Sequence, residues 1–172
     1  MTDLTRAFIE ESRRHLSRDF LPKIREAVEP LSEADVWWKP NPVSNSVGNL
    51  LLHLSGNLGQ WVGSALGDRP DERRRDREFD PAETPDKATL LARLNASVAE
   101  ADEVLASLDP AVLSERRTIQ AREVTGFEAL YHAVEHFSMH TGQILYIAKL
   151  RTGRDLRFYE MVDGVPKAKW GR

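Results

Sequence analysis

Three histidines recur at intervals of four residues near the end of the chain, His132, His136 and His140, and Gln143 follows them. Residues three or four apart on an α-helix project from the same face, so these four side chains would form one stripe. Imidazoles four residues apart have Cβ atoms roughly 6 Å apart, close enough for two rings to bind one ion. Histidine is costly in an apolar core unless its ring nitrogens are satisfied, and a divalent metal ion would satisfy them.

A further histidine lies far away in the sequence, within the apolar stretch NLLLHLSGNLGQW. Leucines flank His53 on both sides, so the pattern predicts that its side chain is buried. It would supply a third imidazole from a second helix, and two neighbouring histidines among His132, His136 and His140 would supply the others. The spacing leaves open which pair of that series binds, and also whether the histidines only form hydrogen bonds. His15 belongs to a charged stretch and is expected at the surface.

Four stretches have the apolar spacing of helices, about residues 4–28, 47–66, 85–108 and 127–151. Pro22 is expected to kink the first helix, Ser46 to cap the second, and Thr125 with Glu128 to cap the fourth. Four helices joined by medium loops predict an all-α fold, a four-helix bundle in a single domain over residues 1–172.

The connections carry fewer signals. Residues 118–124 are either a short strand or an extended connection, and we see no convincing run of strands elsewhere. The medium loop between the second and third helices contains DERRRDRE, from Asp71 to Glu78, whose four arginines balance four acids, so we expect a solvated loop. We expect residues 155–172 to form a C-terminal tail that lies over the bundle, with the Trp170 side chain packed against the helices.

Composition narrows the classes of function. The chain has no cysteine, which rules out disulfides, thiolate metal sites and a cysteine nucleophile. A net charge of −3 and a pI of about 6.0 do not suggest nucleic acid as a partner. No stretch approaches the ~20 apolar residues of a membrane span, and the N-terminus lacks the apolar core of a signal peptide. We therefore expect a soluble, cytoplasmic protein that does not bind membranes.

The histidine strings also resemble those of a known family. ALYHAVEHFSMHTGQILYI is similar to the final motif of the DinB/YfiT-like superfamily, and LSEADVWWKPNPVSNSVGNLLLHL to the segment leading to its first metal histidine. The resemblance implies a four-helix bundle that holds zinc or nickel on three histidines and often forms a homodimer. Carried over by position, the ligands are His53, His136 and His140, with His132 beside them. Iron and manganese also suit three imidazoles.

Three neutral imidazoles would leave the charge of the ion uncompensated and at least one coordination position open, which is typical of catalytic sites. The resemblance implies thiol-dependent transferases or isomerases and hydrolases. Met139 and Thr141 depart from the usual motif, which puts a particular substrate in doubt. We therefore predict a transferase or hydrolase that activates a low-molecular-weight thiol or water for attack on a small electrophile. The alternative is a non-catalytic metal-binding stress or interaction protein.

Other polar residues on the histidine faces are candidates for orienting the ligands or moving protons. They are His132, Asn57, Gln60 and Gln143. Trp61 is expected either to line a pocket or to pack between helices. The sequence assigns no general base, since Glu128 is expected to be a helix cap and Glu135 to be exposed.

Overall fold

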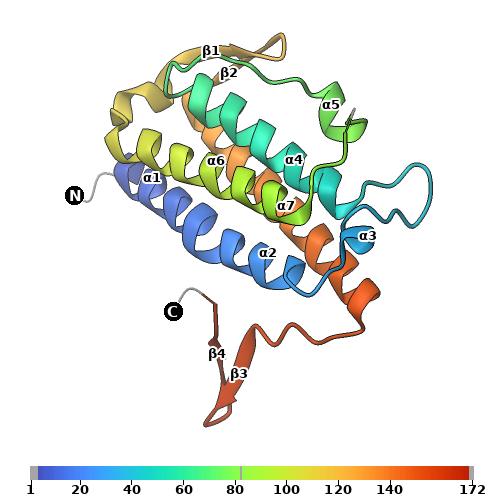
Figure 1. Ribbon diagram of the computed structural model, residues 1–172. Helices are drawn as coiled ribbons and strands as arrows, with labels where there is room; N and C mark the ends of the chain where they lie inside the picture. Colours follow the sequence, from blue (N-terminus) through green and yellow to red (C-terminus); the bar gives the residue numbers. More distant parts are fainter. Residues whose placement is uncertain (1–3, 82, 171–172) are drawn as a thin grey trace.

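The computed structural model describes residues 4–81 and 83–170. It is predominantly helical, and four long helical segments run side by side (Figure 1). The first comprises α1 (Leu4–Arg14), the π-helical η1 (His15–Phe20) and α2 (Leu21–Val28), and the second comprises α4 (Val47–Leu58) and the π-helical η2 (Gly59–Ser64). The third is α6 (Lys87–Ser107) and the fourth is α7 (Gly126–Thr152). These bounds match the four stretches expected from apolar spacing.

Local signals explain where the helices begin and end. The Ser46 side chain accepts a hydrogen bond from the Asn49 backbone N–H, and the Asn49 side chain bonds back to the Ser46 N–H. Thr125 and Glu128 form the same reciprocal box at the start of α7. Each box satisfies N–H groups that lack partners within the first helical turn. Helix α7 ends at Gly153, which has the left-handed φ of 63° that glycine tolerates well.

The first helical segment is distorted just before Pro22. Over η1 the backbone forms the wider turns of a π-helix, and the Leu21 N–H bonds to the Leu16 carbonyl five residues back. Pro22 has no N–H to donate, so it cannot continue the ordinary ladder of hydrogen bonds. Where the sequence predicted a kink at Pro22, the structure has a π-helical stretch just before it.

Helix α4 is buried along almost its whole length. Every residue of α4 except Gly56 is buried, including His53 and the polar side chains of Asn49 and Asn57. A helix that is apolar on nearly all sides must be covered on all sides. Helices α6 and α7 and the short helix α5 (Asp76–Phe79) all contact it. This burial brings His53 into contact with side chains from two other parts of the chain.

The loop between the second and third helical segments departs from the prediction. Its middle folds against α4 through α5, and Glu78 is only 4% exposed. The Asn49 side-chain amide donates to the backbone oxygens of Glu78, at 2.9 Å, and Phe79, at 3.2 Å. The solvated-loop prediction was wrong for these residues because a balanced charge count does not show which charges pair with one another.

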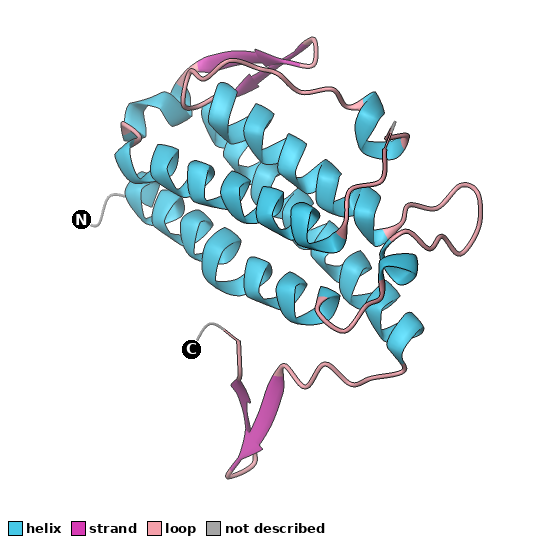
Figure 2. Cartoon of the chain, in the orientation of Figure 1, coloured by secondary structure: helices cyan, strands magenta, loops and turns pink. Residues whose placement is uncertain are grey.

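Two short antiparallel hairpins add strands to the helices (Figure 2). Strand β1 (Arg116–Ile119) pairs with β2 (Arg122–Thr125) within the stretch expected to be a strand or an extended connection. Strand β3 (Tyr159–Val162) pairs with β4 (Val165–Ala168), which corrects the expectation of no further strands. Asp163 and Gly164, both with positive φ, form the turn of this second hairpin. Asp-Gly between apolar residues is a strong hairpin signal, and the emphasis on helical spacing missed it.

The remaining elements connect these parts. They are α3 (Glu33–Val36) and the 3-10 helix η3 (Pro110–Ser114). Much of the expected C-terminal tail forms the second hairpin, and residues 171–172 lie outside the described residues. The Trp170 ring stacks beneath the Lys23 ammonium, 3.7 Å from the ring centroid, so it does contact the first helical segment. Within the described residues, no helix is both long and apolar enough to cross a membrane.

Candidate metal centre

The three histidines predicted as ligands meet between α4 and α7. His53 comes from α4, while His136 and His140 lie one turn apart on α7. The Nε2 atom of His136 is 3.0 Å from Nε2 of His53 and 3.1 Å from Nε2 of His140. One ring nitrogen from each residue lies within 4.8 Å of the other two, and His53 and His140 are buried. The fold thus directs three imidazole nitrogens at one point.

Hydrogen bonds on the far side of two rings indicate which nitrogens carry protons. Nδ1 of His53 lies 2.7 Å from Glu78 Oε2, and Nδ1 of His140 lies 2.7 Å from Gln143 Oε1. Both partners are acceptors, so each Nδ1 carries the hydrogen and each Nε2 presents a lone pair. Nε2 of His136 can donate a hydrogen to only one of them. At least one of the two close nitrogen–nitrogen contacts therefore has no hydrogen bond, and a cation between the rings would stabilise it.

The spacing and the donor set fit a divalent transition metal. Nitrogens bound at ~2.0–2.1 Å to a tetrahedral zinc ion are about 3.3 Å apart, close to the 3.0 and 3.1 Å that separate His136 Nε2 from the other two. Nδ1 of His136 is buried and has no hydrogen-bond partner within residues 4–81 and 83–170. Its ring is therefore not held by a hydrogen bond on its outer side, in contrast to the other two.

The surroundings of His136 and His140 favour the neutral ring, the form that binds metal. Burial, together with the neighbouring His140 and His53, lowers the pKa of His136 to about 3. Burial also lowers the pKa of His140, although its hydrogen bond with Gln143 opposes this shift. Burial acts to raise the pKa of the Glu78 carboxyl, but hydrogen bonds from His53 and Arg73 outweigh it and leave that pKa below its usual value.

Comparison with known proteins identifies the family. The sequence profile of the DinB superfamily matches residues 21–144, well over half of the chain, and all the histidines of the cluster lie within that range. The chain belongs to the DinB superfamily.

Solved structures share the fold of this DinB-superfamily chain. One is the crystal structure of a DinB-like protein from Bacillus subtilis at 2.30 Å resolution, with a TM-score of 0.64 and 19% identity over 84% of this chain and 93% of that one. Another is a conserved protein from Enterococcus faecalis, with a TM-score of 0.62 and 21% identity over 90% of this chain and 98% of that one. No curated protein matches the chain.

The structure places the other candidate residues at different distances from the cluster. Gln143 contacts His140 directly, and the His132 ring lies 5.1 Å from the His136 ring, centroid to centroid. The Asn57 amide lies 3.4 Å from Nε2 of His132, and the Trp61 ring is 4.1 Å from the His132 ring. His132 is thus enclosed by two of the predicted residues while remaining partly exposed.

Gln60 does not contact the histidines. Its side-chain oxygen accepts hydrogen bonds from Arg73 and Gln120, and its amide donates to Asp71. Gln60 is linked to the cluster through Arg73, which donates to the Gln60 oxygen and also lies 3.2 Å from Nδ1 of His53. Glu128 is a helix cap and Glu135 is exposed, as expected.

Sequence reasoning missed Glu78 and Arg73, which form the polar wall behind His53. The Arg73 guanidinium donates from Nε to Glu78 Oε1 at 2.7 Å and from Nη2 to Glu78 Oε2 at 2.9 Å. Their side chains are only 3% and 5% exposed. Both residues lie in the charged run of residues 71–78. The spacing of charges in that run does not show which of them are buried and paired and which are solvated.

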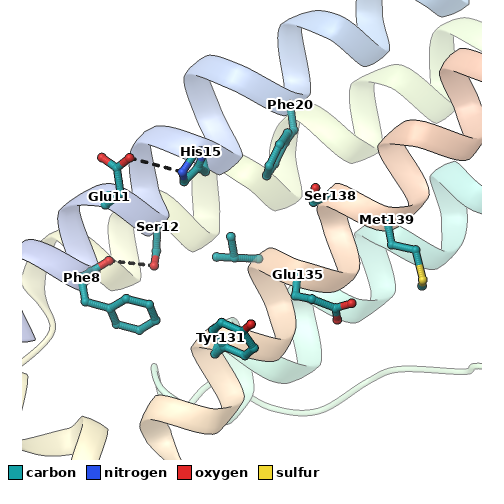
Figure 3. Close-up of a pocket in the computed structure, with 10 residues that line it drawn as sticks. Phe8, Glu11, Ser12, His15, Phe20, Tyr131, Glu135, Ser138 and Met139 are labelled. Carbon is teal, nitrogen blue, oxygen red and sulfur yellow. Dashed lines mark hydrogen bonds and ion pairs between the residues drawn. The ribbon is translucent and has the colours of Figure 1, made fainter.

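A cavity of about 600 Å³ lies on another face of the molecule. Figure 3 shows Tyr131, Glu135 and Met139 of α7 facing Phe8, His15 and Phe20 of the first helical segment. The three clustered histidines are not among its lining residues. This cavity is therefore separate from the candidate metal centre.

Proposed function

We propose that the protein is a metal-dependent enzyme that holds one divalent ion on His53, His136 and His140. The observation that carries this proposal is the convergence of the Nε2 atoms of the three histidines. The superfamily membership supports it. Zinc or nickel is the expected ion, and iron or manganese also suits imidazole ligands. The four long helical segments would then form the four-helix bundle expected from the resemblance.

The reaction we propose is the activation of a low-molecular-weight thiol or of water for attack on a small electrophile, in a transferase or hydrolase. A divalent ion bound by three neutral ligands supplies a Lewis acid that lowers the pKa of a thiol or water molecule. The chain's own residues orient the ligands, since Gln143 holds the His140 ring and Glu78 holds the His53 ring. No charged protein ligand offsets the charge of the ion.

His132 is the residue best placed to move a proton. It is partly exposed beside His136, and burial lowers its pKa, so it is neutral near pH 7 and able to accept a proton. The Asn57 amide and the Trp61 ring contact its imidazole and restrict its orientation. We propose His132 as the proton acceptor for the incoming thiol or water.

Metal analysis tests the proposal directly. Protein purified without a histidine tag should contain about one equivalent of zinc or nickel per chain, and a His53→Ala, His136→Ala double variant should contain none. His15→Ala is the matched control, because this partly exposed histidine lies outside the cluster and should retain the metal. Wild-type protein that stays metal-free after addition of both ions would remove the basis for the enzyme proposal.

The alternative is a non-catalytic metal-binding protein of the same fold. The observation that favours it is the burial of His53, at 5% exposure, and His140, at 8%. Cobalt-substituted protein separates the two functions, because an added small thiol would shift its visible absorption if a coordination position is open. An unchanged spectrum would favour the non-catalytic alternative.

We also propose that the protein forms a homodimer, as the resemblance implies, and that it is cytoplasmic. Large apolar side chains remain exposed along α7, namely Phe127, Tyr131, Met139, Tyr146 and Leu150. Exposed apolar surface of this extent on one helix is typical of a surface that another chain covers. Light scattering coupled to gel filtration should give twice the mass of the 19.5 kDa chain. A Tyr131→Glu, Tyr146→Glu variant should give the mass of one chain.

A further inference from the structure

We infer that Arg73 and Glu78 are positioning residues that select the metal-binding tautomer of His53 and thereby set the affinity of the site. The inference rests on the proposed metal site and assigns a role to the segment between η2 and α6. Neither residue contacts the point where the three Nε2 atoms meet. Both act through the opposite side of the His53 ring.

The contacts form a short buried chain. Glu78 Oε2 lies 2.7 Å from His53 Nδ1, and both oxygens of Glu78 accept hydrogen bonds from Arg73. Two parallel bonds between a guanidinium and a carboxylate define the geometry of both groups. Because the side chains of Arg73 and Glu78 are almost fully buried, water does not compete for these bonds.

Arg73 makes the choice of tautomer depend on Glu78. Its Nη2 atom lies 3.2 Å from His53 Nδ1, within donating distance. With Glu78 present, the carboxylate accepts the Nδ1 hydrogen, and the Nε2 lone pair is free for a metal. Without the carboxylate, Arg73 would donate to Nδ1 and the ring hydrogen would move to Nε2. That tautomer cannot bind an ion through Nε2.

Gly56 leaves the space that this ion pair needs. A Cβ atom at this position would overlap Glu78 Oε1 and lie 3.2 Å from Arg73 Nε. Gly59, one turn further along the same helical segment, has no atom within 4 Å of the equivalent position. An alanine at 56 would therefore displace the carboxylate without removing any polar group, and an alanine at 59 would not.

Other contacts hold the segment against α4. The Asn49 amide bonds to the backbone oxygens of Glu78 and Phe79, and the Phe79 ring lies 4.9 Å from the His53 ring, centroid to centroid. Glu78 is thus held by hydrogen bonds to both its backbone oxygen and its side-chain carboxylate. Such preorganisation is what a group that orients a metal ligand requires.

The first test measures zinc affinity by competition with a chelator of known affinity, using the full chain. We expect Glu78→Ala and Gly56→Ala to weaken zinc binding by about 10- to 100-fold. Glu78→Gln should bind with intermediate affinity, because its amide oxygen can still accept the Nδ1 hydrogen. Gly59→Ala is the matched control and should stay within about twofold of wild type. Wild-type affinity in both Glu78→Ala and Gly56→Ala would overturn the inference.

The second test does not need a bound metal. Nitrogen-15 NMR of the metal-free protein at pH 7.5 distinguishes the two tautomers of His53 by the chemical shifts of its ring nitrogens. We expect the Nδ1–H form in wild type and Gly59→Ala, and the Nε2–H form in Glu78→Ala. The same tautomer in wild type and Glu78→Ala would overturn the inference. If wild type bound no zinc, the proposed function would fail, while this spectrum would still decide the role of Glu78.

Discussion

The side-chain oxygen of Gln143 lies 2.7 Å from Nδ1 of His140, one turn before it on α7. A neutral amide therefore does for His140 what a buried carboxylate does for His53. Amide and carboxylate both accept the Nδ1 hydrogen, but the carboxylate adds a full negative charge beside its ring. The two ligands from opposite helices are thus oriented in the same way and differ in their electrostatic support.

Removing the Gln143 amide should weaken metal binding. In Gln143→Leu, the His140 ring loses the acceptor for its Nδ1 hydrogen, and we expect zinc affinity to fall by about 10-fold. Gln120→Leu is a suitable control, because the Gln120 amide bonds to Gln60 and not to a histidine. Chelator competition measures both variants. Equal affinity for the wild type and Gln143→Leu would show that the amide does not support the site.

The metal-free protein should lose stability as the pH falls from about 6.5 towards 3. An unfolded histidine binds a proton below a pKa of about 6.5, whereas folded His136 remains neutral until about pH 3. The unfolded state therefore binds more protons within this window, and the free energy of unfolding must decrease as the pH drops through it. Burial shifts the pKa values of His132 and His140 in the same direction.

Urea unfolding of the metal-free protein at pH 7.5 and pH 5.0 measures this effect. The His136→Leu variant should show a smaller difference between the two pH values, because one of the neutral histidines is gone. A Gln120→Leu control, which removes no titratable group, should keep the full difference. A stability that is independent of pH between 7.5 and 5.0 would contradict the prediction.

Two glycines of α7 should respond in opposite ways to alanine. A Cβ at Gly126 would overlap the Val112 carbonyl oxygen and lie 3.0 Å from the Leu113 Cα, both backbone atoms. A Cβ at Gly142 would meet no atom within 4 Å. We expect Gly126→Ala to lower the free energy of unfolding by about 1–3 kcal/mol. Gly142→Ala should raise it by about 0.5–1 kcal/mol, because alanine is the better helix former.

Thermal and urea unfolding of both glycine variants, each with zinc bound and without, measures the two effects. A destabilised Gly142→Ala variant would indicate that another chain covers this exposed part of α7. In that case, the loss should appear together with a lower oligomeric mass.

Phe137 should be a major contributor to stability. It lies between the stripe residues of α7, is only 1% exposed, and its ring stacks 6.1 Å from the ring of Phe20 on the first helical segment, centroid to centroid. Truncating it to alanine should lower the free energy of unfolding by about 3–5 kcal/mol. Met161→Ala is the control, since 67% of Met161 is exposed and it lies outside α7, so its loss should cost far less. Similar unfolding midpoints for the two variants would contradict the packing described here.

The predicted stretches located the four long helical segments closely because their signals are local. Ser46 and Asn49 bond within one turn, as do Thr125 and Glu128, so capping depends on residues three positions apart. The stripe of His136, His140 and Gln143 depends in the same way on the helical period alone. The second hairpin was missed although its signal, Asp163-Gly164, is also local, because helical spacing dominated the interpretation.

The sequence by itself therefore determined the helices, their caps and the histidines that face inward, since each depends on neighbours within a few positions. The tertiary structure decided which ring nitrogens come together and which side chains bond to the opposite side of each ring. Arg73 and Glu78 are indistinguishable from solvated charges until their segment packs on α4, where burial makes pairing with each other and with His53 necessary. The helical face of Gln60 predicted that it belongs to the same site. In the structure its side-chain oxygen instead accepts hydrogen bonds from Arg73 and Gln120. Such pairings join residues that are far apart in the sequence, so the helical period of the sequence cannot predict them.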